Sequence, residues 1–298
     1  MDHFDRIRIF QKGWNFGQDG PGNRLLYHFQ GCNMKCPWCS NPEGIMKRGT
    51  LMVNKTRLLD AVCPYGAISN QALNRELCRH CQTKDCLNKN RNEGIRYSSI
   101  TYSVDDLFEE ICRSRHLFYS GGGVTFTGGE PTLQFNALRK LLERIKVESI
   151  NAAIETNGTS SRLPELFRYL DTLIIDLKHW SSKTHTKVLG ADNQIILENL
   201  EKASDARVRT WLRIPLIPGF NDSYKDIIHF VHIVRSLNHG GFFLEILPYH
   251  EYGKVKWEQS GMDYKMGSKK LAPEIVSKAE EIFKMDQINV ITNGRGLL

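Results

Sequence analysis

The chain has 298 residues, 41% of them hydrophobic and 24% charged, and its 40 basic residues against 33 acidic ones give a formal net charge of +7. No apolar run is long enough to span a bilayer, the first ten residues contain acidic side chains and no secretory signal, and no motif indicates nucleic-acid binding. We therefore expect a cytoplasmic protein that binds neither membranes nor nucleic acids. In that reducing compartment its eight cysteines are better explained as metal ligands than as disulfides.

Six short apolar runs predict β-strands, and amphipathic stretches between them predict helices. The strand-like runs span residues 25–30, 124–127, 152–156, 173–177, 208–216 and 242–247. Helical spacing groups Leu133, Leu138, Leu141, Leu142 and Ile145, then Ile227, Ile228, Val231, Val234 and Leu237, and lastly Ile275, Val276, Ala279, Ile282 and Phe283. This last helix opens with Pro273 near its first turn, where proline is tolerated.

Strands that alternate with helices indicate parallel strands joined by crossovers, so the expected fold class is α/β, either a barrel or an open part of one. Residues 48–98 break this pattern, because they contain four cysteines and many turn-forming residues but few periodic apolar ones. We interpret them as a small inserted domain, with residues 1–47 and 99–298 forming the barrel. Removing the insert leaves about 250 residues, the usual size of such a barrel.

The most distinctive motif follows the first strand, where Cys32, Cys36 and Cys39 have the spacing CxxxCxxC. Three thiolates in one short loop suit a 4Fe–4S cluster held at three corners, which leaves one iron open to chemistry. Structural zinc is the competing interpretation, but it needs a fourth ligand, and no further Cys or His follows within about twenty residues. A set of cysteines without any metal is the weakest alternative.

Polar residues end the other predicted strands. They are Thr127-Gly128-Gly129-Glu130-Pro131 after the second, Glu155-Thr156 at the third, Asp176-Leu-Lys178 at the fourth, Arg213 within the fifth and His250 after the sixth. Each alone has an ordinary explanation, such as a turn, a helix cap, a buried ion pair or a solvated loop. Because the C-terminal ends of barrel strands meet at one rim, we expect these residues to converge beside the cysteine loop. Together they could hold a zwitterionic cofactor with amine, carboxylate and ribose groups.

The cysteine motif, with Trp38 before its last cysteine and Gly128-Gly129-Glu130-Pro131 further on, resembles the radical S-adenosylmethionine (SAM) superfamily. Within it, the strings DGPGNR at 19–24, CPWCSNPE at 36–43, SGGGV at 120–124, DLK at 176–178 and LPYH at 247–250 resemble activating enzymes of glycyl radical enzymes, the pyruvate formate-lyase activase group. The likeness runs through nearly the whole chain. It implies a partial (β/α)6 TIM-like barrel and an oxidoreductase of anaerobic metabolism.

The resemblance also implies a mechanism. SAM chelates the open iron, and one electron from the cluster cleaves it to methionine and a 5'-deoxyadenosyl radical, which takes hydrogen from a glycine of a partner glycyl radical enzyme. By the same resemblance, Gly128, Gly129 and Glu130 lie near the amino group of SAM, and Trp38 lies near its adenine.

Further residues match family positions at the cofactor. Lys178, Arg213 and His250 match positions that contact it or line its pocket, and Lys178 joins the three cysteines in the catalytic set. In some relatives the positions of Glu155, Thr156 and Asp176 hold a monovalent cation beside the carboxylate of SAM. The chain departs from the family at two places: Glu155 is longer than the aspartate of the best-known activase, and Asn23 replaces an aliphatic residue.

The insert contains Cys63 before a proline, then Cys78, Cys81 and Cys86. In two-cluster ferredoxins, three cysteines of one run hold one cluster and the cysteine before proline holds the other. On this pattern the four cysteines complete one auxiliary 4Fe–4S cluster in a ferredoxin-like insert, whereas many longer activases carry two. A four-cysteine zinc knuckle is the alternative. Cys112 shares a helical face with apolar neighbours and is expected to be a buried small hydrophobe.

Two other functions fit parts of the sequence: a radical SAM enzyme that acts on a small molecule, and a non-catalytic iron–sulfur electron carrier or sensor. The strings at 120–124 and 247–250 argue against the first, and cleavage of SAM would exclude the second. The activase interpretation further implies a monomer that receives electrons from flavodoxin or ferredoxin. The partner could be pyruvate formate-lyase, a diol or glycerol dehydratase, a choline lyase or a decarboxylase.

Overall fold

A computed structural model describes residues 5–59, 63–79, 81–89, 94–237, 242–288 and 290–292. The expected barrel ranges also include residues 1–4, 238–241, 289 and 293–298, and the expected insert includes 60–62, 80 and 90–93, all of which lie outside the described residues. In the part that is described, no helix is long and apolar enough to cross a membrane.

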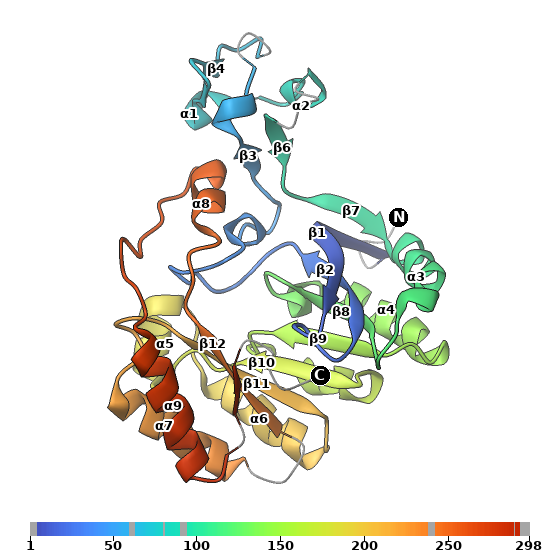
Figure 1. The fold of residues 1–298 in the computed structure, drawn as a ribbon. Coiled ribbons are helices and arrows are strands. Elements are labelled where there is room, and N and C mark those ends of the chain that lie inside the picture. The colour runs from blue at the N-terminus through green and yellow to red at the C-terminus, as the bar shows by residue number, and fades with distance from the viewer. Residues whose placement is uncertain are drawn as a thin grey trace.

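One large mixed sheet organises the chain (Figure 1). Its nine strands are ordered β13-β12-β11-β10-β9-β8-β2-β1-β7. They span, in chain order, β1 Arg6–Phe16, β2 Asn23–Phe29, β7 Ile100–Ser103, β8 Gly123–Gly128, β9 Ala152–Thr156, β10 Thr172–Asp176, β11 Thr210–Leu216, β12 Phe242–Pro248 and β13 Val290–Thr292. Neighbours from β2 to β13 are parallel, whereas β1 is antiparallel to both β2 and β7. All six predicted strands are confirmed, and each is one of the parallel strands.

Helices connect consecutive parallel strands along one face of this sheet. They are α3 Val104–Arg113, α4 Phe135–Val147, α5 Ser182–Leu189, α6 Gln194–Asp205, α7 Tyr224–Ser236 and α9 Pro273–Met285, with the 3-10 segments Pro131–Gln134 and Leu163–Tyr169. The predicted helical faces are largely confirmed, since Leu138, Leu141, Leu142 and Ile145 are fully buried. Leu133 is a correction: it lies in the 3-10 turn before α4 and is 39% exposed, because the helix begins after it.

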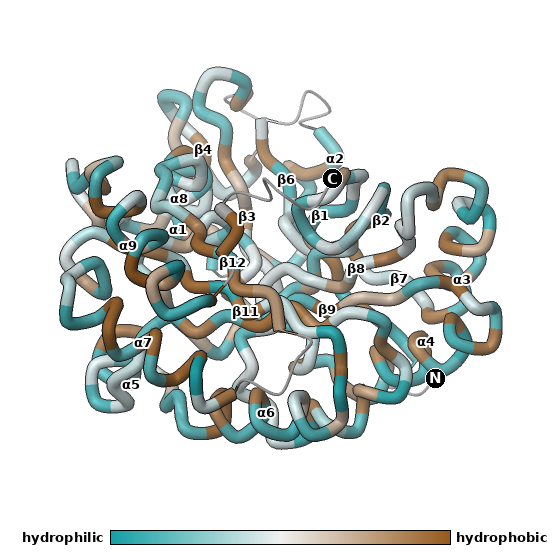
Figure 2. Tube along the Cα trace, turned by 60° about the horizontal axis from the view of Figure 1, so that its bottom comes forward, coloured by the Kyte–Doolittle hydropathy of each residue, from teal (hydrophilic) through white to brown (hydrophobic). Residues whose placement is uncertain are grey.

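The strands place different residues on their two faces. One face contributes apolar side chains such as Val124, Phe126 and Ile154 to the main core that it shares with the helices. The brown segments along β9 and β11 in Figure 2 mark these apolar stretches. The alternate positions carry buried polar side chains, including Thr125 and Arg213. The local period of two therefore turns one set of residues towards the helices and the other towards the opposite face of the sheet.

Residues 48–98 leave the sheet and return to it through a short antiparallel pair. β3 (Leu51–Val53) pairs with β6 (Ile95–Tyr97), and between them lie β4 (Ile68–Ser69), β5 (Ala72–Leu73), α1 (Arg75–Cys78) and α2 (Cys86–Lys89). This segment projects beyond the rest of the chain next to α8 (Lys254–Ser260) (Figure 1). A small apolar cluster of its own holds it together; the buried members are Leu51, Val53, Leu58, Ile68, Cys86 and Ile95.

Candidate active site at the strand ends

A pocket opens where the cysteine loop meets the C-terminal ends of the parallel strands. Of the predicted site residues, its wall contains Cys32, Cys36, Trp38, Cys39, Gly128, Gly129, Glu155, Thr156, Asp176, Lys178 and His250. These residues come from segments far apart in the chain, and the parallel order of β2 and β8 to β12 brings them together. The predicted convergence at one rim is therefore seen in the structure, while the roles of the individual residues stay predictions.

The three-cysteine loop is fixed by its backbone and has buried thiols. The Cys32 amide donates to the Ile45 carbonyl at 3.0 Å, and the Cys39 amide donates to the Cys36 carbonyl at 3.1 Å. Burial raises the pKa of all three thiols, that of Cys39 to about 12. Three neutral thiols facing one pocket fit a metal cluster, because metal binding displaces their protons and supplies the charge that stabilises buried thiolates.

The glycine turn after β8 packs directly on the strand that leads into the cysteine loop. Gly128 has φ +120°, and a Cβ there would lie 2.3 Å from the Phe29 amide nitrogen; a Cβ on Gly129 would lie 2.2 Å from the Gly31 carbonyl oxygen. The Gly129 amide instead donates to the Phe29 carbonyl at 2.9 Å. No side chain fits at either position, so two glycines allow the turn to reach the cysteine loop.

Glu130 has a different place from the one expected, since it does not line the pocket. Its buried carboxylate accepts hydrogen bonds from the amide and hydroxyl of Thr132, from the Thr156 hydroxyl at 2.8 Å and from the Asn157 amide at 2.8 Å. Burial raises the pKa of Glu130, and these donors oppose that shift. The carboxylate thus orients the Thr156-Asn157 turn from behind the wall, and its contact with a cofactor stays a prediction.

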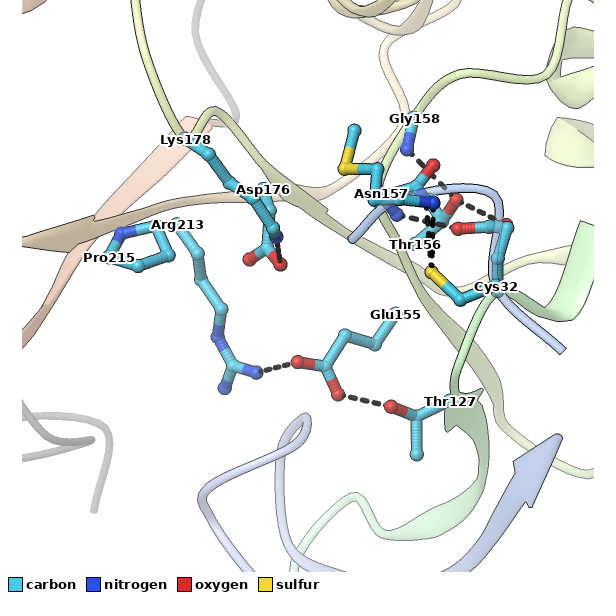
Figure 3. A network of polar contacts seen from close by, with 12 residues as sticks. Cys32, Thr127, Glu155, Thr156, Asn157, Gly158, Asp176, Lys178, Arg213 and Pro215 are labelled. Carbon is cyan, nitrogen blue, oxygen red and sulfur yellow. Dashed lines mark hydrogen bonds and ion pairs between the residues drawn. The ribbon is translucent and has the colours of Figure 1, made fainter. Parts of the chain in front are cut away.

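Asp176 and Lys178 form a buried ion pair on the opposite wall (Figure 3). Burial disfavours the charged Lys178, but the Asp176 carboxylate outweighs it and raises the pKa of the ammonium group. The other Asp176 oxygen, Oδ1, is buried without a hydrogen-bond partner. Because a buried acceptor without a donor is costly, this oxygen favours a bound molecule that brings a donor or a cation into the pocket.

Arg213 lies beneath the pocket and not in its wall. Its guanidinium contacts Glu155 at 2.6 Å, Glu245 at 2.7 Å and Asp19 at 3.2 Å, and these carboxylates raise its pKa despite the cost of burial. Figure 3 shows how Glu155 connects Arg213 to Thr127, whose hydroxyl donates to the carboxylate at 2.6 Å. Arg213 can therefore influence the pocket through Glu155, and direct contact with a cofactor stays a prediction.

Several wall residues had no role assigned from the sequence, although Ser40, Asn41, Thr127 and the residues from 247 to 249 stand in motifs quoted above. The residues without an assigned role are Met34, Ser40, Asn41, Ile45, Thr127, Asn157, Pro215, Ile217, Leu247, Pro248 and Tyr249. Asn157 is the most informative of them. Its side-chain nitrogen Nδ2 lies 3.9 Å from the Cys32 sulfur and donates to Asn33 Oδ1 at 2.9 Å. Its position directly after Thr156, at the end of a predicted strand, could have predicted its place at the site. For the apolar wall residues, the sequence offers no sign of a place at the site except that they stand next to motif residues.

The insert brings its own cysteines close to one another. Burial and neighbouring thiols raise the pKa of Cys78 and of Cys86; the neighbours include Cys63 and Cys81. Among the described residues, no three or more Cys, His, Asp or Glu side chains are arranged so that they could hold a metal ion, in the insert or in the three-cysteine loop. Cys112 lies apart on α3 and packs against the main core, but it is only partly buried, so the expectation of a buried small hydrophobe is met in part.

Known proteins resemble the chain over most of its length. The radical SAM superfamily model matches residues 72–231, which include the wall from Gly128 to Lys178 but not the three-cysteine loop. The chain is 33% identical over 286 residues to the 4-hydroxyphenylacetate decarboxylase activating enzyme of Clostridioides difficile (strain CD196), covering 89% of each protein. The chain belongs to the activating enzymes of the radical SAM superfamily.

A second relative and a solved structure extend the comparison. The chain is 32% identical over 286 residues to the isethionate sulfite-lyase activating enzyme of Nitratidesulfovibrio vulgaris, covering 89% of this chain and 91% of that one. The structure of Streptococcus suis SuiB bound to its precursor peptide SuiA gives a TM-score of 0.55 at 15% identity, covering 91% of this chain and 48% of that one. SuiB supports the mixed α/β fold alone.

Membership of the family decides between the functions considered above. The activating enzyme is a radical SAM oxidoreductase that uses a 4Fe–4S cluster and SAM and acts on a partner glycyl radical enzyme. It is neither a simple electron carrier nor, by its relatives, an enzyme for a free small molecule.

Proposed function

We propose that Cys32, Cys36 and Cys39 hold the 4Fe–4S cluster of this activating enzyme and that SAM binds in the pocket beside them. The observation that carries the proposal is that the three cysteines line the same pocket as Asp176, which has one buried carboxylate oxygen without a hydrogen-bond partner. When bound, the cluster supplies the electron that cleaves SAM to methionine and the 5'-deoxyadenosyl radical, and the radical then takes hydrogen from a glycine of the partner.

The wall residues provide complementary chemistry for SAM. Gly128 and Gly129 bring the turn after β8 into the wall beside the cysteine loop, and Trp38 and Tyr249 offer aromatic surface for the adenine. Lys178 supplies a positive charge, with Asp176 fixing its position. We assign the remaining polar wall to Glu155, Thr156 and His250. The buried polar walls hold the ligand in one orientation and limit the access of water.

A monovalent cation beside SAM is a finer proposal. Asp176 offers an oxygen without a hydrogen-bond partner, and Thr156 lies in the same wall, with its hydroxyl already donating to Glu130 at 2.8 Å. Both oxygens of Glu155 are engaged, one by Arg213 at 2.6 Å and one by Thr127 at 2.6 Å. Because both Glu155 oxygens are already engaged, we propose that Asp176 is the main ligand of this cation.

We further propose that residues 48–98 form a ferredoxin-like domain with one auxiliary 4Fe–4S cluster on Cys63, Cys78, Cys81 and Cys86. The support is that burial and then the neighbouring thiols, Cys63 and Cys81 among them, raise the pKa of Cys78 and Cys86, and that the apolar cluster around these cysteines is small. Very small domains commonly need a metal to compensate for a small core. A zinc knuckle at the same cysteines remains the competing assignment, and metal analysis separates the two.

The rest of the chain, residues 1–47 and 99–298, is proposed to be a partial (β/α)6 barrel. Its parallel strands follow the chain order, apart from the antiparallel extension of β1 and β7. Leu26, Ala153, Ile174 and Trp211 are buried although they do not belong to the core shared with the helices. Burial of both faces is what a sheet curved around its own concave side requires.

The partner is proposed to be a glycyl radical enzyme, with flavodoxin or ferredoxin as electron donor and the activating enzyme as a monomer. Relatives named for a decarboxylase and for a sulfite-lyase are 33% and 32% identical to the chain, so identity singles out neither partner. Specificity lies in the surface that receives the glycine loop.

The proposal is tested with anaerobic, dithionite-reduced protein and SAM. We expect formation of 5'-deoxyadenosine and methionine, and, with the cognate partner, a glycyl doublet in electron paramagnetic resonance. Protein that carries both clusters but forms no 5'-deoxyadenosine would contradict the proposed site. Incubation with a panel of candidate glycyl radical enzymes then identifies the partner.

A further inference from the structure

The short helix α8 lies between the two groups of cysteines. It follows Tyr249 and His250, which line the pocket, after a few residues. In Figure 1 it stands between the main body and the projecting insert. Neither the cysteine motifs nor the strand-end motifs include this helix, so the proposed chemistry leaves its contacts unexplained.

One set of α8 contacts holds the three-cysteine loop. The buried Trp257 indole donates from Nε1 to the Cys39 carbonyl at 2.8 Å. Lys256 donates from Nζ to Asn41 Oδ1 at 2.7 Å and pairs with Glu43 Oε1 at 3.0 Å. Glu43 is 2% exposed, so Lys256 compensates a buried charge on the same loop.

Another set of α8 contacts holds the insert. One nitrogen of Arg75, Nη2, donates to the carbonyl of Gln259 at 2.9 Å and to the carbonyl of Leu51 at 3.0 Å. The Ser260 hydroxyl lies 3.0 Å from the Met52 sulfur. Arg75 begins the helix that ends at Cys78, so this contact lies one helical turn from a proposed cluster ligand.

Glycines allow close packing at both ends of α8. A Cβ on Gly253 would lie 2.7 Å from the Cys39 carbonyl oxygen, and a Cβ on Gly261 would lie 2.0 Å from Arg75 Nε. The helix therefore packs closely against the loop at one end and against Arg75 of the insert at the other. A short rigid element with fitted contacts at both sides can transmit order from one to the other.

We propose that α8 ties the insert to the three-cysteine loop, with Arg75, Lys256 and Trp257 as positioning residues. Folding of the insert around its metal fixes Arg75, Arg75 fixes α8, and Trp257 and Lys256 fix the backbone that carries Cys39. The inference rests on the proposed function in that it takes both cysteine groups as cluster sites. It assigns the insert a structural influence on the active site, whether or not the insert also carries electrons.

Hydrogen–deuterium exchange of the anaerobic holoenzyme tests this tie without relying on activity. The reporters are the amides of Cys39, Gly44 and Ile45, which donate within the loop to Cys36, Asn41 and Pro42 at 3.1, 2.9 and 3.1 Å. We expect Arg75→Ala to speed exchange at these amides about tenfold, because the loop then opens locally more often. The matched control is Arg79→Ala, since Arg79 makes an exposed pair with Glu76 at 3.1 Å; it should leave the loop unchanged.

Two further variants locate the coupling. Trp257→Phe removes the donor to Cys39 and should speed exchange in the loop but not in the insert. Cys78→Ala with Cys81→Ala removes the insert metal and should loosen the loop as Arg75→Ala does.

Faster exchange confined to the insert and α8, with the loop as in the wild type, would overturn the proposal. If Arg75→Ala fails to fold, unchanged loop exchange in Trp257→Phe is equally decisive. Failure of the proposed function is seen separately, as wild-type protein that binds no iron or cleaves no SAM.

Discussion

The two cysteine groups differ in how much polypeptide supports them. Cys36 is buried in the main core, and Cys32 and Cys39 pack against it. The insert has only a small separate cluster, and large apolar side chains such as Tyr65 and Leu77 are 56% and 50% exposed. On the proposed assignment of two clusters, we therefore expect the body to fold before its metal binds and the insert to depend on metal for much of its stability. If both assignments hold, the comparison teaches that one sequence can use cysteine ligands for chemistry in one region and for structure in another.

The largest expected effect separates chemistry from folding in the body. Cys36→Ala should reduce formation of 5'-deoxyadenosine to background, because the cluster loses one of three ligands, while the thermal transition of the body persists. The control is Cys112→Ala, which changes a half-buried thiol outside both groups and should retain cleavage. Anaerobic product analysis and circular dichroism measure both effects. Retained cleavage in Cys36→Ala would refute the ligand assignment.

The next prediction concerns the insert, where we expect the loss of metal ligands to affect folding. Cys78→Ala combined with Cys81→Ala should lower iron from about eight to about four atoms per chain. Because the small core alone stabilises the insert little, residues 48–98 should become sensitive to protease while the body stays resistant. Iron analysis and limited proteolysis measure the outcome. Unchanged iron, or zinc at these cysteines, would contradict the auxiliary cluster.

A third prediction concerns the turn that meets the cysteine loop. Gly128→Ala should destabilise the protein by roughly 3 kcal/mol, because the new Cβ combines an unfavourable φ with a clash against the Phe29 backbone. Gly121→Ala is the matched control: its φ is +75° but nothing lies within 4 Å of the new Cβ, so about 1 kcal/mol is expected. Anaerobic denaturant unfolding compares them. Equal losses would show that the close approach is not what requires glycine.

The smallest expected effect lies between the regions. Lys55 pairs with Glu258 of α8 at 2.7 Å, but both side chains are more than half exposed, at 61% and 63%. Lys55→Ala should therefore shift the melting temperature by less than about 2 °C. Differential scanning calorimetry measures the shift. A larger drop in melting temperature would indicate that this surface pair, and not Arg75, makes the main connection between insert and body.

The predicted strands were accessible from sequence because buried parallel strands read as continuous apolar runs. β1 was missed for the opposite reason: Arg6 and Arg8 alternate with the buried Ile7 and Ile9, so no continuous run forms. β7 and β13 are too short to stand out. Leu133 was assigned to a helical face because spacing alone does not show that Pro131 opens a 3-10 turn first.

The sequence predicted those parts of the candidate site that depend only on where the parallel strands end. The ends of parallel strands share an edge, which placed Gly128, Glu155 and Asp176 beside the cysteines. The same rule placed Glu130 and Arg213 there too, but it gives only the edge and not the direction of a side chain. The Glu130 carboxylate turns away from the pocket because it accepts hydrogen bonds from Thr132 and Asn157. The Arg213 guanidinium does so because it pairs with carboxylates beneath the pocket.

The amino-acid sequence by itself determined which residues could do chemistry: three cysteines spaced for one cluster, four more in an insert, and polar groups after buried strands. Tertiary structure alone decided which of these groups share the pocket, which lie behind its wall, and that α8 contacts both the loop of Cys39 and the insert. The physical reason is that ligand type and spacing are local, whereas contacts between residues far apart in the chain depend on how the sheet curves and how side chains pack.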